Sequence, residues 1–484
     1  HHAPEGPDAR VDPVVAVLDL DRVRHGELYP GDLGQPRACV ADVGGVARAL
    51  RVGERDRSGV RRGLRGRGGP VPVDDAGAVG LGDGPDASED VHTDRTGARL
   101  KALVSVGPPA RGRFRCLLAG AEVPRRMDDT RRAFLDDLLA TPSPSGFETP
   151  VQRVWTDYVR GFADRVETDA YGNAVAVHEG ASDAPTIAFT GHADEIGFIV
   201  RDVLDDGFLR IGRIGGSDRT VSKGQHVTVH ADEPVQGVIG QTAIHLRDGG
   251  DEEYENVAEQ FVDIGVADAD EAREHVEVGD PVTFSTGVRD LVGDRLAARG
   301  VDNRAGIWAA AEGLRRAAAA GTDATVCAVS TVQEEVGLQG ARMVGVDRDA
   351  VDAFVAVDVT HATDNPDVDR ERRGPVELGA GPVIGRGSAN HPVLVDLARG
   401  AADEADLDVQ LQAAGTRTGT DADAFYTARG GTPALNVSIP NRYMHTPVEV
   451  IDTADLDGVA DLLAAIGAAA GDVEPGPEPF AVDV

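Results

Sequence analysis

The sequence predicts an α/β layered fold with helices on both faces of a sheet, together with a small β-rich insert. From Met127 onward, short apolar β-branched runs alternate with helical patterns, which is typical of this fold class. Between about residues 196 and 290 the pattern changes to short strand-like runs separated by glycines. The chain has 484 residues, of which 41% are hydrophobic, so it can bury sizeable cores.

Helices are predicted where apolar residues recur every three or four positions. Residues 128–140 show this spacing at Phe134, Leu135, Leu138 and Leu139. Ser145 and Glu148 have the spacing of a capping box, which predicts that the next helix covers about 149–162. The same periodicity predicts the remaining helices at 304–320, 392–405 and 453–470.

Strands are predicted where short β-branched, apolar runs are bounded by turn residues. Six of these runs lie outside the insert, at 173–178, 186–190, 324–330, 351–358, 407–412 and 433–438. Four more lie within it, at 207–211, 225–230, 237–240 and 281–284. We therefore expect the chain to form one α/β domain in two parts, with a β-rich domain inserted between them.

Composition separates the first 126 residues from the rest of the chain. They carry 18 acidic and 20 basic residues. Since the whole chain has 82 acidic and 48 basic residues, residues 127–484 carry 64 acidic and 28 basic ones. They lack sustained periodicity, so we expect 1–126 to be disordered or a non-native upstream extension; an accessory domain is the alternative. The predicted boundaries are then 127–195 and 291–470 for the main domain, 196–290 for the insert and 471–484 for a flexible tail.

The formal net charge of −34 argues against nucleic acid or an anionic membrane surface as the partner. No run of 18 apolar residues occurs, which excludes a membrane-spanning helix. Lys101 and Lys223 are the only two lysines. An acidic, lysine-poor surface repels itself in dilute buffer, whereas ~1 M salt screens that repulsion. We expect a cytoplasmic, halophilic protein; a GC-rich genome that prefers arginine codons is the alternative.

Several kinds of active site are absent from the sequence. The chain contains neither a phosphate-binding P-loop motif nor the Gly-x-Ser-x-Gly motif of a nucleophilic serine. Three cysteines in so long a chain exclude a disulfide scaffold, and their spacing is not that of a thiolate metal cluster. Cys327 lies inside an apolar strand, where a buried thiol is usually inert.

Carboxylates and histidines follow the predicted strands or begin a helix, at the edge where open α/β sheets bind ligands. This set contains two imidazoles, three carboxylates and no sulfur: His192, Asp302, Glu335, Asp358 and His445. Such ligands suit zinc, cobalt or manganese, and five are more than one catalytic metal normally takes. Two metals that share one carboxylate are therefore the simplest interpretation.

Two further carboxylates accompany this set. Glu334, beside Glu335, remains free to act as a base, and Asp194 shares a strand face with His192 and could orient its imidazole. Each motif taken alone has an ordinary structural explanation. Asp302 could cap a helix, the two glutamates could form a solvated turn, and the His192–Asp194 pair could be hydrated at a loop edge.

The residues and the order of these segments resemble those of a known family. They read GHADEIGF at 191–198, VDN at 301–303, QEEVG at 333–337, VDVTH at 357–361 and PNRYMHT at 440–446. In this order they resemble metallopeptidase family 42, the self-compartmentalising tetrahedral, glutamyl aminopeptidase-like metallo-aminopeptidases. The resemblance covers essentially all of 127–484. It implies a three-layer α/β/α zinc-peptidase-like catalytic domain, and a β-rich inserted domain that mediates dimerisation.

The resemblance also implies roles for individual residues. The metal ligands would be His192, Asp302, Glu335, Asp358 and His445, with Asp302 bridging two divalent ions, zinc or cobalt. Glu334 would be the general base, and Asp194 would stand behind His192. The implied reaction is removal of N-terminal residues from peptides, by an assembly of dimers into a tetrahedral dodecamer.

Three alternatives remain open. The related metallo-aminoacylases and carboxypeptidases use a similar order of ligands, but they carry their lid after the glutamate pair. Here the β-rich insert lies between Asp194 and Asp302 instead. A glycoside hydrolase also uses paired carboxylates, and proteins of this family have been labelled endoglucanases, but two histidines would then be idle. A non-catalytic binding or assembly protein is the third.

Overall fold

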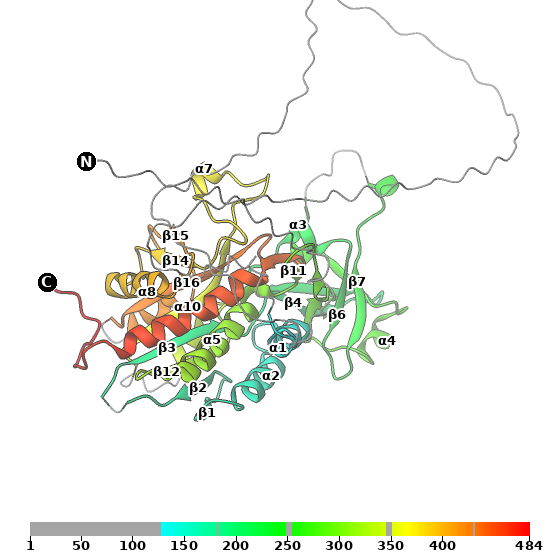
Figure 1. The fold of residues 1–484 in the computed structure, drawn as a ribbon. Helices are drawn as coiled ribbons and strands as arrows, with labels where there is room; N and C mark the ends of the chain where they lie inside the picture. Colours follow the sequence, from blue (N-terminus) through cyan, green and yellow to red (C-terminus); the bar gives the residue numbers. More distant parts are fainter. Residues whose placement is uncertain (1–126, 182, 248–253, 345–350, 429–430) are drawn as a thin grey trace, which may run out of the picture. The chain divides into compact units, whose positions relative to one another are not determined.

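The computed structural model describes residues 127–181, 183–247, 254–344, 351–428 and 431–484 (Figure 1). The predicted upstream segment 1–126 lies outside the described residues. Among the described helices, none combines the length and the apolar character that crossing a lipid bilayer requires.

An eight-stranded sheet forms the centre of the larger domain, in the order β1-β2-β12-β3-β13-β16-β14-β15. The bounds are β1 Arg165–Thr168, β2 Ala174–His178, β3 Thr186–His192, β12 Thr325–Thr331, β13 Ala353–His361, β14 Val383–Arg386, β15 Gln410–Ala413 and β16 Ala434–Asn441. The four neighbouring strands β12, β3, β13 and β16 are parallel. Their carboxyl ends therefore lie along one edge of the sheet.

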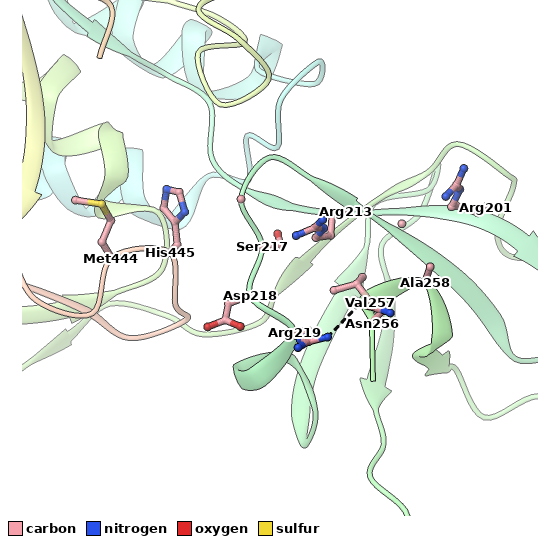
Figure 2. A pocket seen from close by; sticks show the side chains of 12 residues that line it. Arg201, Arg213, Ser217, Asp218, Arg219, Asn256, Val257, Ala258, Met444 and His445 are labelled. Atoms are coloured by element: carbon pink, nitrogen blue, oxygen red, sulfur yellow. Dashed lines mark hydrogen bonds between the residues drawn. The ribbon is translucent and has the colours of Figure 1, made fainter. Parts of the chain in front are cut away.

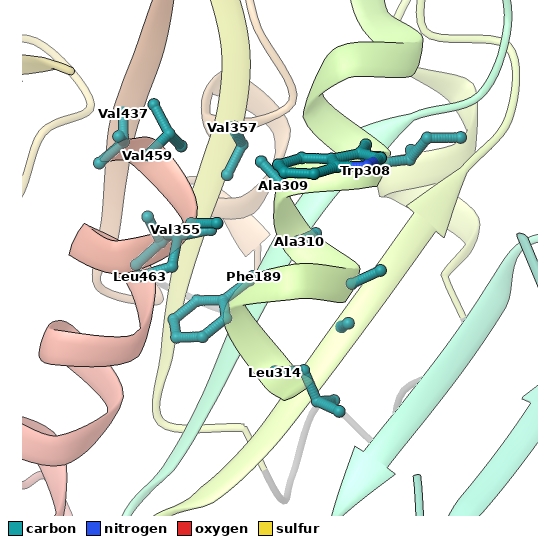
Figure 3. Close-up of a cluster of buried hydrophobic side chains, with 14 of the residues drawn as sticks. Phe189, Trp308, Ala309, Ala310, Leu314, Val355, Val357, Val437, Val459 and Leu463 are labelled. Carbon is teal, nitrogen blue, oxygen red and sulfur yellow. The ribbon is translucent and has the colours of Figure 1, made fainter. Parts of the chain in front are cut away.

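Side chains on successive strand positions enter two different cores, because neighbouring residues in a strand point to opposite faces of the sheet. Phe189 and Val355 belong to the larger core, whereas Ala188 and Phe354 belong to the smaller one. In Figure 3, Phe189 and Val355 lie between the sheet and helices α5 and α10. Burial on both faces explains why these strands are almost continuously apolar.

Helices cover both faces of the sheet, as predicted. The larger core contains residues of α1 Asp129–Ala140, α2 Thr149–Val159, α5 Val301–Ala320, α8 Pro392–Glu404 and α10 Thr453–Gly471. The smaller core contains residues of α6 Gln339–Met343 and α9 Ala422–Phe425. Three further short helices are α3 Arg219–Ser222, α4 Ala269–Arg273 and α7 Arg370–Arg373, and the two 3₁₀ turns are Ile244–Leu246 and Val257–Glu259. The larger domain is therefore a layered α/β fold.

A closed six-stranded barrel with its own apolar core lies between β3 and α5 in the chain. Its strands are β4 Gly197–Val203, β5 Leu209–Ile214, β6 Gln225–Val229, β7 Val235–Ile239, β8 Phe261–Asp263 and β9 Pro281–Phe284. The glycine-punctuated pattern predicted four of them but not β4 or β8. A small sheet of β10 Arg289–Asp290, β11 Arg295–Ala298 and β17 Glu449–Asp452 follows the barrel.

Two local predictions were wrong. The Ser145–Glu148 capping box does not form: the Ser145 hydroxyl donates to Asp194 at 2.6 Å, and the Glu148 carboxylate accepts from the backbone N–H groups of Gly146 and Gln333. Tertiary partners have replaced the local ones. The strand predicted at 407–412 begins only at Gln410, because residues 406–407 close the turn after α8.

Candidate metal centre

The parallel strands bring the predicted ligands to one edge of the sheet. His192 is the last residue of β3, Asp358 lies near the end of β13, and the glutamate pair follows β12. His445 lies in the loop after β16, and Asp302 is the second residue of α5. The fold therefore brings together side chains that are up to 253 positions apart in the sequence (192 to 445).

Asp302 lies between the two imidazoles. Its Oδ1 is 3.1 Å from Nε2 of His192, and its Oδ2 is 3.2 Å from Nε2 of His445. The residue departs from helical dihedral angles, and the N-cap position is Gly300, so the alternative that Asp302 caps the helix was wrong. One carboxylate that presents an oxygen to each histidine has the arrangement of a bridging ligand.

Two ligand groups share this carboxylate. Oxygen and nitrogen atoms of His192, Asp302 and Asp358 lie within 4.8 Å of one another, and so do those of Asp302, Glu335 and His445. In the first group, Nε2 of His192 is 3.8 Å from Oδ1 of Asp358; in the second, Nε2 of His445 is 3.4 Å from Oε1 of Glu335. The structure thus brings all five predicted ligands together as two overlapping triads.

Glu334 and Asp194 also lie at this centre. Oε2 of Glu334 is 3.8 Å from Nε2 of His192, and the glutamate is buried, so the alternative of a solvated acidic turn was wrong. Asp194 is completely buried, and its Oδ1 lies 3.3 Å from Nδ1 of His192. The same carboxylate accepts the backbone N–H groups of Glu334 at 2.9 Å and Glu335 at 3.1 Å. Asp194 therefore holds both the imidazole and the glutamate pair.

The carboxylates of the centre crowd one another in a buried place. Burial raises the pKa of Glu334 to about 10. Asp358 and other nearby acids act in the same direction, whereas His192 opposes the shift. Burial likewise raises the pKa of Asp358. The carboxylates of Asp302 and Glu335 beside the His445 imidazole raise the pKa of His445 to about 11. These raised pKa values reflect crowded negative charge that the two imidazoles do not fully neutralise.

A divalent cation fits this donor set. Among the largest influences on the pKa values of Asp302, Glu334, Glu335 and Asp358, the cationic groups that lower these values are the two imidazoles. Oε1 of Glu335 is buried and has no hydrogen-bond partner in the described part of the chain. Nδ1 of His192 donates a hydrogen bond to the backbone carbonyl oxygen of Asp194 at 3.1 Å, which leaves Nε2 facing the centre. Buried acids of this kind normally have a metal or an ion pair as partner.

Sequence reasoning missed Glu449, a buried residue on β17. Its carboxylate accepts the backbone N–H of His445 at 2.8 Å and that of Asp302 at 3.2 Å. Burial and the nearby Asp302 raise its pKa to about 8. Glu449 thus ties together the backbones of two predicted ligands. No sequence signal identifies it, because it lies in a short strand that pairs only through the tertiary fold.

The sequence analysis also missed an ion-pair cluster of Glu195, Arg299 and Arg304. Burial by itself would raise the pKa of Glu195. The positive charges of Arg299 and Arg304 have the larger effect and lower this pKa to about 2. Arg304 donates to both carboxylate oxygens, at 2.7 and 2.9 Å. Glu195 follows Asp194 directly, whereas the two arginines flank Asp302. This ion-pair cluster therefore joins the two chain segments that carry those aspartates.

A pocket of about 750 Å³ opens beside His445, with walls from the barrel and from the Met444–His445 loop (Figure 2). Gly216 forms the wall nearest the imidazole: a Cβ atom there would lie 2.6 Å from Nδ1 of His445. Side chains larger than glycine cannot approach so closely. His445 is also the more open of the two imidazoles, with 34% of its side chain exposed against 2% for His192.

Comparison with known proteins places the chain in one family. The family model described as M42 glutamyl aminopeptidase matches residues 172–462. The lysyl aminopeptidase of Pyrococcus furiosus is 31% identical over 339 residues, which cover 68% of this chain and 94% of that protein.

Solved structures agree with this match. An aminopeptidase from Desulfurococcus kamchatkensis is 31% identical with a TM-score of 0.65, over 72% of this chain and 96% of that one. The Pyrococcus horikoshii TET1 peptidase, described as assembling into a tetrahedron or a large octahedral shell, is 28% identical with a TM-score of 0.63, over 70% of this chain and 99% of that one. The chain therefore belongs to the M42 glutamyl aminopeptidase family, as its motifs indicated, and is a peptidase, a hydrolase of peptide bonds.

Proposed function

We propose that the protein is a metal-dependent aminopeptidase that uses two divalent metal ions to remove N-terminal residues from peptides. The observation that supports this most directly is the position of Asp302, with one carboxylate oxygen near each imidazole. His192 and Asp358 would hold one ion, Glu335 and His445 the other, and Asp302 would contact both. When bound, such ions lower the pKa of water and stabilise negative charge on a carbonyl oxygen. Zinc or cobalt suits this set of nitrogen and oxygen donors.

Glu334 is the proposed general base. It lies 3.8 Å from His192 yet belongs to neither ligand triad, so its carboxylate is free to take a proton from water and deliver it to the departing amine. Its raised pKa suits a group that must hold a proton for part of the cycle. Asp194 is proposed as a positioning residue, since it is completely buried and contacts His192 and the backbone of Glu334.

The variant Glu334→Gln tests this assignment. We expect turnover of an aminoacyl-anilide to fall by at least ~10²-fold, which is the usual contribution of a general base, while metal analysis still finds two ions per subunit. Glu371→Gln is the matched control, because Glu371 is exposed on α7. Full activity of Glu334→Gln would remove Glu334 from the mechanism.

The choice of substrate separates the alternatives. A free α-amine at the scissile residue should be required by an aminopeptidase, whereas N-acetylated amino acids are the substrates of an aminoacylase. A carboxypeptidase would instead release the C-terminal residue. Chelator-sensitive release from an aminoacyl-anilide, with no action on a cellulose-type glucan, would also exclude the glycoside hydrolase and the non-catalytic binding protein.

The proposed assembly is a dimer of the chain that forms a tetrahedral dodecamer, with the barrel as the dimerisation domain. Ile244, Leu246 and Tyr254, on the segment between β7 and β8, are 70%, 78% and 54% exposed. Large exposed apolar side chains, here three within eleven positions of the sequence, are the support for a protein interface at this segment. Light scattering at molar salt measures the mass directly, and Leu246→Asp should shift it toward smaller species if this surface is used.

The environment proposed for the protein is the cytoplasm of a salt-accumulating, haloarchaeon-like organism. The support is the net charge of −34 and the presence of only two lysines. Solubility and activity should both rise between 0.1 and ~2 M potassium chloride, because salt screens the repulsion between surface acids. Equal activity and solubility across that range would contradict the proposal.

A further inference from the structure

We propose that the ion pair between Arg442 and Asp364 positions the predicted ligand His445, and thereby sets how tightly the triad of His445 binds its metal ion. The inference rests on the proposed two-metal function and adds a positioning pair to it. Arg442 lies three positions before His445, and Asp364 lies six positions after the predicted ligand Asp358. The pair therefore joins two chain segments that each supply a ligand, one to each triad.

The guanidinium of Arg442 binds the Asp364 carboxylate through two parallel hydrogen bonds. Nε donates to Oδ1 at 2.8 Å, and Nη2 donates to Oδ2 at 2.7 Å. Nη2 also donates to the backbone carbonyl oxygen of Asp364, at 3.3 Å. Only 18% of the Arg442 side chain and 16% of the Asp364 side chain are exposed, so water competes little for these bonds. A pair with two parallel bonds fixes direction as well as distance.

The ion pair extends the contact between β13 and β16 beyond the edge of the sheet. The N–H of Ala362, directly after β13, donates to the carbonyl oxygen of Asn441, the last residue of β16, at 2.9 Å. The next residue, Arg442, pairs its backbone with Val450 on β17 instead, at 2.9 and 3.0 Å. From there on, the side chains of Arg442 and Asp364 connect the segment after β13 to the segment after β16.

Contacts on the Asp364 side make it a fixed partner for the arginine. Ala362 and Leu378, from the segment that carries Asp364, pack with Val450 in a separate buried apolar cluster. The N–H of Leu378 also donates to Oδ2 of Asp364, at 3.1 Å. Because the carboxylate is held in this way, it can restrain Arg442 rather than follow it.

The loop that carries His445 has a backbone that depends on such restraint. Tyr443 and His445 are not glycines, yet both lie in the left-handed region, with φ of 63° each. Residues of this kind keep that conformation where the surrounding structure enforces it. Glu449 accepts the backbone N–H of His445 at 2.8 Å from one end of the loop, and Arg442 is the anchor at the other end. We therefore expect the direction of the His445 imidazole to depend on Arg442.

Titration of the metal-free protein with cobalt(II), followed by calorimetry, measures the effect without relying on activity. The wild type should bind two ions per subunit, and the binding step that His445→Ala removes belongs to the triad of His445. For Arg442→Gln and Asp364→Asn, we expect this step to weaken by ~10- to 100-fold, the usual effect of losing a group that orients a metal ligand. The other step should stay close to its wild-type affinity.

Three further variants test the pair itself. Arg442→Lys keeps the charge but loses the two parallel hydrogen bonds, so it should weaken the same step by less than Arg442→Gln does. The double variant Arg442→Gln/Asp364→Asn should lose no more affinity than the weaker-binding single variant, because the two residues act as a unit. Arg370→Gln is the matched control: Arg370 pairs with Glu377 in the same segment, but both side chains are about half exposed. It should leave both steps unchanged.

Kinetics separate positioning from general destabilisation. Arg442→Gln should need ~10- to 100-fold more cobalt for half-maximal hydrolysis of leucyl-anilide, whereas kcat and KM at saturating cobalt should be close to wild type. A variant that is merely less stable would keep the wild-type dissociation constants. It would instead show a lower melting temperature in its metal-free form and a loss of activity that added metal concentration shifts no differently from wild type.

Two outcomes overturn the inference. If Arg442→Gln, Arg442→Lys and Asp364→Asn all bind both ions with wild-type affinity, the ion pair does not position His445, and the proposed function still stands. If both steps weaken equally, the pair supports the whole centre and not His445 in particular. Failure of the wild type itself to bind two ions, or to hydrolyse any aminoacyl-anilide once both are bound, would instead refute the proposed function.

Discussion

The carboxylate of Asp194 accepts the backbone N–H of Glu334 at 2.9 Å, although the two residues are 140 positions apart. Asp194 also accepts the N–H of Glu335 and faces Nδ1 of His192. A single buried side chain thus fixes the proposed base, one proposed ligand and the ring of another. Groups that hold metal ligands in this way usually affect metal affinity or activity by 10–100-fold.

Replacing Asp194 with asparagine should therefore reduce kcat by about 10- to 100-fold with little change in KM. Asparagine has one acceptor oxygen where aspartate has two, so it can accept only one of the two backbone N–H groups and the loop of the glutamate pair loses one of its two hydrogen bonds. Steady-state kinetics with metal supplied in excess measures the effect. Ser145→Ala, which removes only the 2.6 Å hydrogen bond to Asp194, should have a smaller effect. Equal loss in both variants would argue for general destabilisation.

Replacing Glu449 with glutamine should weaken metal binding by about 10- to 100-fold. The glutamine NH₂ group would face one of the two backbone N–H groups, of Asp302 or His445, that the carboxylate now accepts. Titration of the metal-free protein with zinc, followed by calorimetry, gives the dissociation constants. Glu371→Gln serves again as the exposed control. Unchanged affinity in the Glu449 variant would show that the two ligands are held by other contacts.

Removal of metal should lower the melting temperature as well as abolish activity. Without a cation, the buried acids Asp302, Glu334, Glu335 and Asp358 repel one another, as their mutual effects on pKa values indicate. Metal at about 1,000 times its dissociation constant stabilises a folded protein by about 4 kcal/mol. Thermal melts after chelation, and again after adding zinc, cobalt or manganese, measure the difference. A melting temperature that none of the three metals changes would contradict a buried metal site.

Replacing Arg304 with methionine should destabilise the protein by about 3–5 kcal/mol, because it leaves the buried Glu195 with only part of its compensation. Arg304 is completely buried and contacts both carboxylate oxygens of Glu195. Urea unfolding at constant salt measures the change. The matched variant is Arg160→Met, whose partner Asp157 lies in solvent and where little change is expected. Similar losses in the two variants would contradict the importance of burial.

The Glu195 cluster also predicts a pH dependence. The pKa of Glu195 is about 2 in the folded chain, against an ordinary value of 4.5. Between pH 2 and pH 4.5 the folded state therefore binds fewer protons than the unfolded state. The resulting stabilisation, about 3 kcal/mol, is fully present above pH 4.5 and is lost as the pH falls toward 2. The difference in unfolding free energy between wild type and Glu195→Gln should therefore narrow below pH 4.5. A constant difference from pH 7 to pH 3.5 would contradict this assignment.

Much of the fold was predictable from local patterns. Continuous apolar runs identified the strands that are buried on both faces, such as the one that carries Phe189, and helical periodicity identified α1, α5 and α10. Local patterns failed where tertiary contacts replace local ones. Ser145 has the spacing of a cap but donates to Asp194, and the three residues of β8 are too few to show a period.

The sequence by itself determined the layered fold and the seven acids and imidazoles of the candidate centre, because their types and order along the chain carry that information. Only the tertiary structure decided how they meet: Asp302 faces both histidines, and Asp194 and Glu449 hold the backbone around them. The physical reason is that hydrogen bonds and charge interactions act over a few ångströms. Which distant residues come that close depends on strand order and on the barrel, and no local pattern encodes either of them.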